Sequence, residues 1–367
     1  MSAPDARCRV VITGIGVVDP SLTGGSAALG AYLACPRSYP GPLASNVLAG
    51  AVEGLDVRRL SRVSQLAVAA ARLAVRDATP PSDEPLGLVL GTEFGDLRST
   101  HEFAEGYLAR GQAGLSALLF PNTVMNTMAA ATAIALGARA LSLTINAPTL
   151  AGELAITRAA ACISAGRAER LLAGGVDEMD PFVGEALGQM GVDLGIRGEG
   201  AGFLVLESWE AARARGARVL GEIRGAGSGA LPARPHGVGR CARSPAVAQA
   251  LGRAGLDKGA IAWIYASANG DRLRDSWEGT LLAESLAPHR PPVTALSMLT
   301  GHHAGMGAVR VAAAAWTARS GLFPLVVPSS ASPVATVIRV PAAAGLVHGV
   351  ARGGSQVAIV VGPPPPA

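Results

Sequence analysis

The residues that could carry out chemistry are few and scattered along this chain of 367 residues. None of its cysteines forms a CxxC pair: Cys8, Cys35, Cys162 and Cys241. Such spacing gives neither a disulfide framework nor a zinc or redox motif, and it fits free thiols in a reducing cytoplasm. His101 beside Glu102, and His302 beside His303, have no third ligand at a suitable spacing. The sequence therefore predicts no metal site and no cofactor.

Composition excludes several classes of protein and of binding partner. Apolar residues make up 49% of the chain and charged residues 16%, with 47 glycines, which indicates a folded chain with many close backbone approaches. Lys258 is the only lysine, and the arginines are dispersed, so a nucleic-acid surface is not expected. Prolines and asparagines interrupt the longest uncharged stretches, which therefore do not predict a membrane helix. We expect a cytoplasmic protein.

Short apolar runs, rich in β-branched residues, predict the strands: Arg9–Val18, Leu86–Gly91, Leu141–Ile145, Arg170–Ala173, Gly202–Glu207, Ile261–Ala266, Val334–Val340 and Gln356–Val361. Alanine-rich segments with helical spacing lie between them: Ser61–Ala78, Gly152–Gly166 and Gly305–Ser320. Strands that alternate with helices predict an α/β fold with a mixed or mainly parallel sheet, covered on both faces.

The chain also contains a faint internal repeat. A strand, a sharp turn and a small-residue helix occur at Leu141–Gly166 and again at Pro292–Ser320. Two related halves explain the repeat. The charged, helix-like connector Ser208–Arg218 separates them, so we predict an N-terminal half at residues 1–208 and a C-terminal half at residues 218–367.

Several motifs occur in a fixed order: VVITGIGVV at the start, GTEFG at Gly91–Gly95, LLAGG at Leu171–Gly175, GEGAGFLVLE at Gly198–Glu207, GH at Gly301–His302 and the terminal Gly353–Gly354. Over essentially the whole chain, this set resembles the β-ketoacyl synthases of the thiolase superfamily. The resemblance implies two βαβαβαββ halves in a five-layer αβαβα arrangement. It also implies a dimer that joins acyl groups held on acyl carrier protein.

The resemblance further implies a reacting centre that this chain has largely lost. The family needs a cysteine at a strand-to-helix turn, two histidines, an oxyanion hole and a phenylalanine gate. By family spacing, Thr149 stands at the cysteine position and Ser267 at the first histidine, with Asp275 and Glu278 downstream. His302 keeps the second histidine, whereas Arg352 replaces the gate.

These positions also allow structural interpretations. Thr149 is expected to be the N-cap of a helix that begins at Leu150, with Glu153 in its first turn beside the helix dipole. His302 is either a hydrogen-bonded structural residue or a remaining base. The segment between Gly188 and Gly198 is much shorter than the matching family loop, so contacts of a lid or a partner are not expected to follow the family there.

The family lysine just ahead of the second histidine is also missing from TALSMLTG. Loss of the cysteine, the first histidine, this lysine and the gate on a retained scaffold resembles the chain-length-factor-like subunits. These lack the cysteine and pair with a catalytic ketosynthase subunit in type II polyketide, polyene or fatty-acid-like biosynthesis. One alternative is a cysteine-independent acyltransferase or decarboxylase that acts on acyl carrier protein thioesters through His302. Another is a decayed paralogue that only binds acyl carrier protein or an acyl group.

By the same resemblance, the helix that starts near Leu97 crosses the dimer interface and closes the far end of the partner's acyl tunnel. Thr100, Phe103 and Tyr107 recur at helical spacings and share one face, and Met125 and Met128 on the following loop add flexible apolar wall. The alternative is that Phe103 and Tyr107 pack against this chain's own core.

Overall fold

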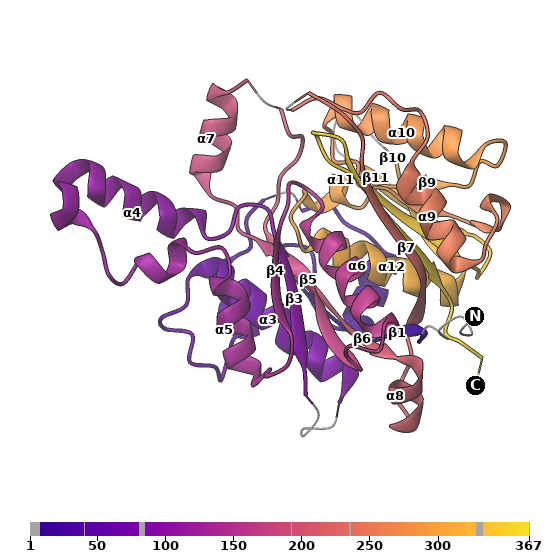
Figure 1. The fold of residues 1–367 in the computed structure, drawn as a ribbon, viewed down its shortest axis with the longest axis horizontal. Helices are drawn as coiled ribbons and strands as arrows, with labels where there is room; N and C mark the ends of the chain where they lie inside the picture. Colours follow the sequence, from indigo (N-terminus) through magenta and orange to yellow (C-terminus); the bar gives the residue numbers. More distant parts are fainter. Residues whose placement is uncertain are drawn as a thin grey trace, which may run out of the picture.

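The computed structural model describes residues 8–39, 41–80, 85–191, 193–234, 236–327 and 333–366. Its main feature is a large mixed sheet with helices on both faces (Figure 1). The strands of this sheet are β1 Val10–Val18, β2 Thr23–Gly24, β3 Gly87–Thr92, β4 Ser142–Asn146, β5 Arg170–Asp177, β6 Gly200–Ser208, β7 Gly221–Ala230, β8 Ile264–Tyr265, β9 Val293–Thr294, β12 Gly345–Val350 and β13 Ser355–Gly362. β10 Leu322–Val327 and β11 Val334–Arg339 pair separately.

The helices agree with the predicted alanine-rich segments and add several others: α1 Ser26–Ala34, α2 Ser45–Ala51, α3 Arg62–Ala78, α4 Leu97–Arg110, α5 Thr127–Leu136, α6 Ala151–Ser164, α7 Pro181–Gln189, α8 Trp209–Ala214, α9 Pro245–Ala254, α10 Arg272–Leu286, α11 Ser297–Thr300 and α12 Met306–Ser320. Short 3₁₀ turns occur at η1 Gly111–Gly114, η2 Phe120–Thr123 and η3 Lys258–Ala260. The predicted segments correspond to α3, α6 and α12.

The order of the strands confirms two related halves. Along the sheet the strands run β4-β3-β5-β6-β1 and then β7-β13-β12-β8-β9. Leaving the short β2 aside, each half counted from its outer edge presents its third, second, fourth, fifth and first strand. The repeated unit found in the sequence is the third strand of each half and the long helix of the middle layer that follows it, β4 with α6 and β9 with α12, although the short α11 lies between β9 and α12. This symmetry supports, as a proposal, the division into residues 1–208 and 218–367.

Five layers follow from the contacts between elements. Helix α3 packs on β1, β5 and β6, and α9 and α10 pack on strands of the second half. Helices α6 and α12 contact each other and both sets of strands, so they form the middle layer. Glycine allows this closeness: a Cβ at Gly16 would lie 2.0 Å from the carbonyl oxygen of Ala70, and one at Gly152 would lie 2.0 Å from that of Ala304.

Two predicted strands differ from the structure. Val334–Val340 was expected in the main sheet, but β11 forms a separate antiparallel hairpin with β10, and its exposure alternates along the strand as in a pair with one solvated face. Ile261–Ala266 shortens to the two residues of β8. No strand was predicted at β7, because GEIRGAGSGA has few β-branched residues. Its glycines let α9 approach: a Cβ at Gly225 would lie 2.3 Å from the carbonyl oxygen of Ala250.

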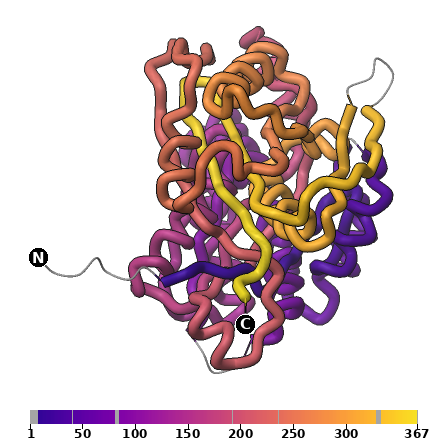
Figure 2. Tube along the Cα trace, turned by 90° about the vertical axis from the view of Figure 1, so that its right-hand side faces the viewer, coloured from indigo at the N-terminus to yellow at the C-terminus, as the bar shows by residue number. Residues whose placement is uncertain are grey.

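The two ends of the described chain meet at β7. Val10 of β1 is paired with Ile223, and Gly362 of β13 is paired with Glu222. Figure 2 shows the indigo start and the yellow end of the described chain close to each other. The predicted connector between the halves contains helix α8. No helix within the described ranges is long and apolar enough to cross a membrane.

Candidate functional site

The sharp turn between β4 and α6 holds Thr149 in an unusual backbone conformation. Its φ is +62°, in the left-handed region that a β-branched residue rarely adopts, and the residue is 8% exposed. The prediction that Thr149 caps the helix is wrong. Leu150 is the N-cap residue, since the left-handed turn delays the first helical residue to Ala151, and no side chain caps this helix. Glu153 lies in the first turn as expected.

His302 lies beside this turn, on the loop that leads into α12. The residue is 1% exposed, and its backbone N–H donates to the carbonyl oxygen of Ile196 at 2.9 Å. Burial, together with the nearby cations of Arg197 and Arg274, lowers the pKa of His302 well below its usual value, although a contact with the backbone of Thr149 opposes the shift. A histidine of such low pKa is neutral at pH 7 and is a weak proton acceptor.

Ser267 follows β8 and is committed to an internal hydrogen-bond network. Its hydroxyl donates to Oε2 of Glu278 at 2.9 Å, and its backbone N–H donates to the same atom at 3.0 Å. The hydroxyl also accepts from the backbone N–H of Val350 at 3.2 Å. His348, which the sequence did not single out, places Nδ1 3.0 Å from Oε1 of Glu278. Glu278 on α10 therefore connects the residue that follows β8 with β12.

Gly349 brings this network next to the strand-to-helix turn. A Cβ at Gly349 would lie 2.7 Å from the side chain of Leu150 and 3.7 Å from the Cβ of Ser267. Thr149, Ser267 and His302, which lie far apart in the sequence, therefore occupy one region between the two halves. Their functional roles remain predictions.

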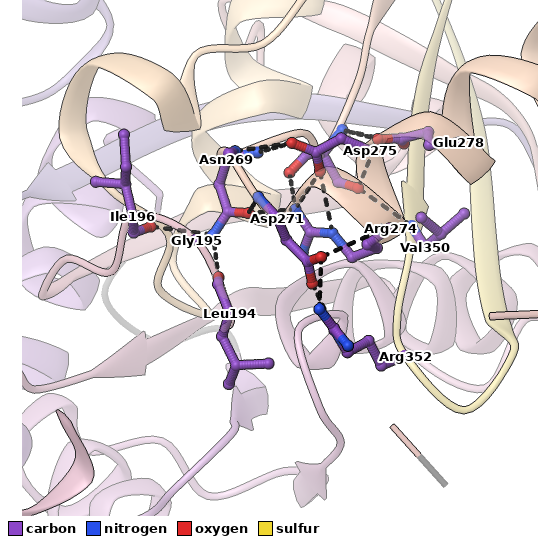
Figure 3. Close-up of polar contacts among 12 residues, drawn as sticks. Leu194, Gly195, Ile196, Asn269, Asp271, Arg274, Asp275, Glu278, Val350 and Arg352 are labelled. Carbon is purple, nitrogen blue, oxygen red and sulfur yellow. Dashed lines mark hydrogen bonds and ion pairs between the residues drawn. The ribbon is translucent and has the colours of Figure 1, made fainter. Parts of the chain in front are cut away.

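Arg352 is held by a two-point ion pair, shown in Figure 3. Its Nε lies 2.7 Å from Oδ2 of Asp271, and its Nη2 lies 2.8 Å from Oδ1. The arginine side chain is 18% exposed and the aspartate side chain 2%. Asp271 also caps α10 by accepting from the backbone N–H of Arg274 at 3.2 Å. Sequence reasoning placed Arg352 at the gate but missed Asp271, although an aspartate directly before a helix is a recognisable capping signal.

Asp177, another residue that sequence reasoning missed, ties the GTEFG loop to the histidine loop. Its Oδ1 accepts from the hydroxyl of Thr92 at 2.8 Å and from the backbone N–H of Glu93 at 2.9 Å. Its Oδ2 accepts from the backbone N–H of Ala304 at 2.7 Å. Burial raises the pKa of Asp177 to about 6. The described segments contain no group of three or more His, Cys, Asp or Glu side chains arranged to hold a metal ion.

The predicted tunnel residues lie on or after α4, which projects from the body of the molecule in Figure 1. Thr100 is exposed and donates its hydroxyl to the carbonyl oxygen of Asp96 at 2.7 Å. Phe103 is half-buried, with its ring 6.0 Å from that of Phe120, and Tyr107 is 52% exposed. Neither belongs to the buried core, so the prediction that they pack there is not supported by their exposure.

The two methionines differ from each other. Met125 lies on the connection before α5 and is 37% exposed. Met128 was expected on that same loop, and this is wrong: it lies in α5, is fully buried and packs in the core beneath α3. The reason is that the helix already begins at Thr127, which turns Met128 towards the interior. A role of Met128 in a tunnel wall would need an opening in this core.

Comparison with known proteins agrees with this geometry. Residues 48–212 match the sequence family described as "Beta-ketoacyl synthase, N-terminal domain". A protein of Streptomyces halstedii named putative polyketide beta-ketoacyl synthase 1 is 30% identical over 360 residues, which cover 83% of this chain and 84% of the relative. The chain belongs to the β-ketoacyl synthase family.

Solved structures of this family share the fold. The ishigamide ketosynthase/chain length factor superimposes with a TM-score of 0.89 at 23% identity, covering 98% of this chain and all of the other. A chain from the structure of a type II polyketide synthase acyl carrier protein in complex with its ketosynthase superimposes with a TM-score of 0.83 at 21% identity. The match covers 98% of this chain and all of the other. The thiolase-like fold expected from the motifs is therefore confirmed.

Proposed function

We propose that this chain is a chain-length-factor-like subunit, without condensing activity of its own, that pairs with a catalytic ketosynthase and shapes its acyl tunnel. The observation that carries the proposal is the turn between β4 and α6. There the position of the nucleophile is occupied by Thr149, whose hydroxyl is far less acidic than a thiol. His302 beside it has a pKa well below the usual range, so it is a poor base for activating that hydroxyl.

The other positions of the reacting centre support the same conclusion. Ser267 cannot replace a histidine as a proton donor, and its hydroxyl is already bonded to Glu278. Arg352, at the gate, is paired with Asp271. Two of the positions that a condensing enzyme would use are here bonded to carboxylates of this chain, which favours a scaffold over an acyltransferase.

The surface around α4 and β4 supports a protein partner. Strand β4 forms one edge of the sheet and is only partly buried. Large apolar side chains on the segment from α4 to β4 are exposed: Tyr107, Leu108, Leu115, Leu118, Phe120, Val124, Met125, Ile134 and Leu141. An exposed apolar area on a projecting arm is typical of an interface. We propose that β4 pairs with its counterpart in the ketosynthase across a pseudo-twofold axis, and that α4 reaches the partner's tunnel.

The names of the similar proteins support a role in the biosynthesis of a particular class of product. One similar structure is named a ketosynthase/chain length factor, and another contains a type II polyketide acyl carrier protein with its ketosynthase. We therefore propose polyketide or related acyl-chain biosynthesis in the cytoplasm, with acyl carrier protein delivering the chain to the complex. The described part of the chain has its four cysteines free, which is compatible with a reducing compartment.

The test is coexpression with the complete ketosynthase encoded nearest to this gene. The two chains should copurify at a one-to-one ratio and elongate acyl groups, whereas this chain alone should not. Leu118→Asp, at a side chain that is 88% exposed on the arm, should abolish copurification. Leu273→Asp, at a 49% exposed leucine on α10, is the matched control and should leave it unchanged.

Two outcomes contradict the proposal. A monodisperse monomer that does not respond to the ketosynthase would remove the partner role. Turnover of acyl carrier protein thioesters by this chain alone would favour the cysteine-independent acyltransferase or decarboxylase instead.

A further inference from the structure

We propose that Arg352 closes this chain's own reacting centre by holding three loops together over Thr149 and His302, so that an acyl-pantetheine arm cannot enter. The inference rests on the proposed function, because it treats the β4–α6 turn as the place where such an arm would otherwise be delivered. It adds a specific device: the arm of a carrier protein can be received only by the partner subunit.

Arg352 uses all three of its side-chain nitrogens. Besides the two contacts with Asp271, Nη1 donates to the carbonyl oxygen of His236 at 2.9 Å and Nη2 donates to that of Asp193 at 2.8 Å. His236 belongs to the connection between β7 and α9, and Asp193 to the connection between α7 and β6. One guanidinium therefore joins these two connections to the start of α10. We call this set of contacts the clamp.

The second connection forms a strap, residues 193–198, that runs between the clamp and His302. Asn269 donates its side-chain amide to the carbonyl oxygens of Leu194 at 2.9 Å and Ile196 at 3.0 Å. The backbone N–H of Ile196 donates back to the carbonyl oxygen of Asn269 at 2.8 Å. On the other side, His302 donates to Ile196, and Gly198 donates to His302. Figure 3 shows Leu194 and Ile196 against Asn269, with Arg352 below.

The strap is packed too closely to shift by small adjustments. Gly195 has φ +69°, and a Cβ there would lie 2.6 Å from the backbone nitrogen of Asp271. Arg197 also fixes the strap to the GTEFG loop, because its Nη2 lies 2.6 Å from Oε2 of Glu93. The strap is thus held at Asp193 by a hydrogen bond from Arg352, at Arg197 by an ion pair, and in between by hydrogen bonds to Asn269 and His302.

Opening the clamp would leave a buried carboxylate unpaired. Asp271 is almost fully buried, and two-point arginine–carboxylate pairs are among the strongest charge-assisted hydrogen bonds. The family resemblance implies phenylalanine at this position, which has no hydrogen-bond donor. Arginine therefore replaces a side chain that can swing with one that is held in place.

The experiment measures access to the turn directly. Thr149→Cys is introduced as a reporter in the full chain, alone and with its partner, with the exposed Cys35 and Cys241 changed to serine. Alkylation by iodoacetamide and by chloroacetyl-pantetheine is followed by intact-protein mass spectrometry with peptide mapping. With the clamp intact, the pantetheine probe should react slowly. Arg352→Ala should raise that rate at least tenfold, and Arg352→Lys, which keeps the charge without the fork, should give an intermediate rate.

The control breaks a similar ion pair elsewhere. Arg9 contacts both carboxylate oxygens of Glu222, at 2.7 and 2.9 Å, at the start of β1. Arg9→Ala should leave the labelling rate unchanged. A purely structural clamp would lower stability without changing access, and equal labelling rates with and without Arg352 would overturn the proposal. Fast labelling while the clamp is intact would overturn it as well.

If Arg352→Ala does not fold, hydrogen exchange of the Arg352→Lys chain decides. The amides of Ile196, Gly198 and His302 should exchange at least tenfold faster than in the parent chain, and unchanged exchange would refute the clamp. Neither the labelling rate nor the amide exchange rate depends on formation of a polyketide product. The proposed function fails through loss of copurification or through turnover by the chain alone, so the two failures are distinguishable.

Discussion

Replacing Glu153 by glutamine should strongly destabilise the fold, because it removes the partner of a buried cation. Glu153 on α6 pairs with Arg310 on α12, and both side chains are almost completely buried. Arg310 Nη1 also donates to the carbonyl oxygen of His348 at 2.9 Å, so the pair links the middle helices to β12. Glu153→Gln keeps the shape of the side chain and removes only its charge.

The magnitude follows from the burial of the guanidinium. Burial lowers the pKa of Arg310 from its usual value to about 9. The folded chain therefore holds this cation at a cost that the carboxylate of Glu153 offsets. Breaking one side of a buried ion pair typically costs about 3–5 kcal/mol. We therefore expect Glu153→Gln to lower the unfolding free energy by about 4 kcal/mol.

Urea denaturation followed by circular dichroism measures this change. The control is the double variant Glu153→Gln with Arg310→Met, in which the stranded cation is also removed. It should recover most of the loss, because exchanging a buried pair for apolar or neutral groups is often close to neutral. A loss below about 1 kcal/mol for Glu153→Gln, or a double variant that is no more stable than the single one, would refute the reasoning.

Three further predictions concern the reacting centre and α4. After incubation with acyl carrier protein loaded with a short acyl chain, the chain alone should carry no acyl adduct by intact-protein mass spectrometry; a stoichiometric adduct mapped to Thr149 would contradict this. Phe103→Ala should let the reconstituted pair make longer products while the complex still assembles, whereas unchanged product length with a loss of about 3–5 kcal/mol would indicate core packing. Glu178→Gln should raise the unfolding free energy at pH 8 by about 3 kcal/mol, a gain that should fade in denaturation series as the pH falls from about 7 to 4.5.

The sign of the last effect follows from the direction of the shift. Glu178 directly follows β5, and burial, together with the weaker repulsion from Asp96, raises its pKa from 4.5 to about 7. The folded chain therefore binds a proton more tightly than the unfolded chain. Above pH 7 the carboxylate is charged in both states and opposes folding, and below about pH 4.5 it is neutral in both. An equal gain at every pH would show that the charge of Glu178 is not the cause.

The sequence allowed the fold to be predicted where local and tertiary requirements coincide. β1 and β13 are apolar and β-branched, and they lie in the buried sheet. α3 has a clear amphipathic pattern and lies where its spacing predicts. β7 could not be found, because its glycines are selected for the close approach of α9 rather than for strand propensity. Such tertiary demands leave no local pattern in a single sequence.

For the site, the sequence identified the candidate positions but not the residues that hold them in place. Thr149, Ser267 and His302 were located by the order of motifs, whereas their partners depend on distances that no spacing reveals. His348 lies 70 residues from Glu278, and Asp193 lies 159 residues from Arg352. The error at Thr149 has a local cause: a threonine directly before a helix usually caps it, and a left-handed φ at that residue cannot be inferred from composition.

If the proposed function is right, the residues at the three replaced positions alter the stability of this region together. An active site keeps polar groups unpaired for its substrate and therefore costs stability. Here Ser267 is bonded to Glu278, Arg352 to Asp271 and Arg310 to Glu153, so several charges and hydroxyls around the β4–α6 turn have an internal partner. Reverting Thr149 alone to cysteine would supply a nucleophile without freeing any of these groups. Condensation by this chain should therefore require at least the simultaneous removal of the Arg352 clamp and the return of a histidine at Ser267.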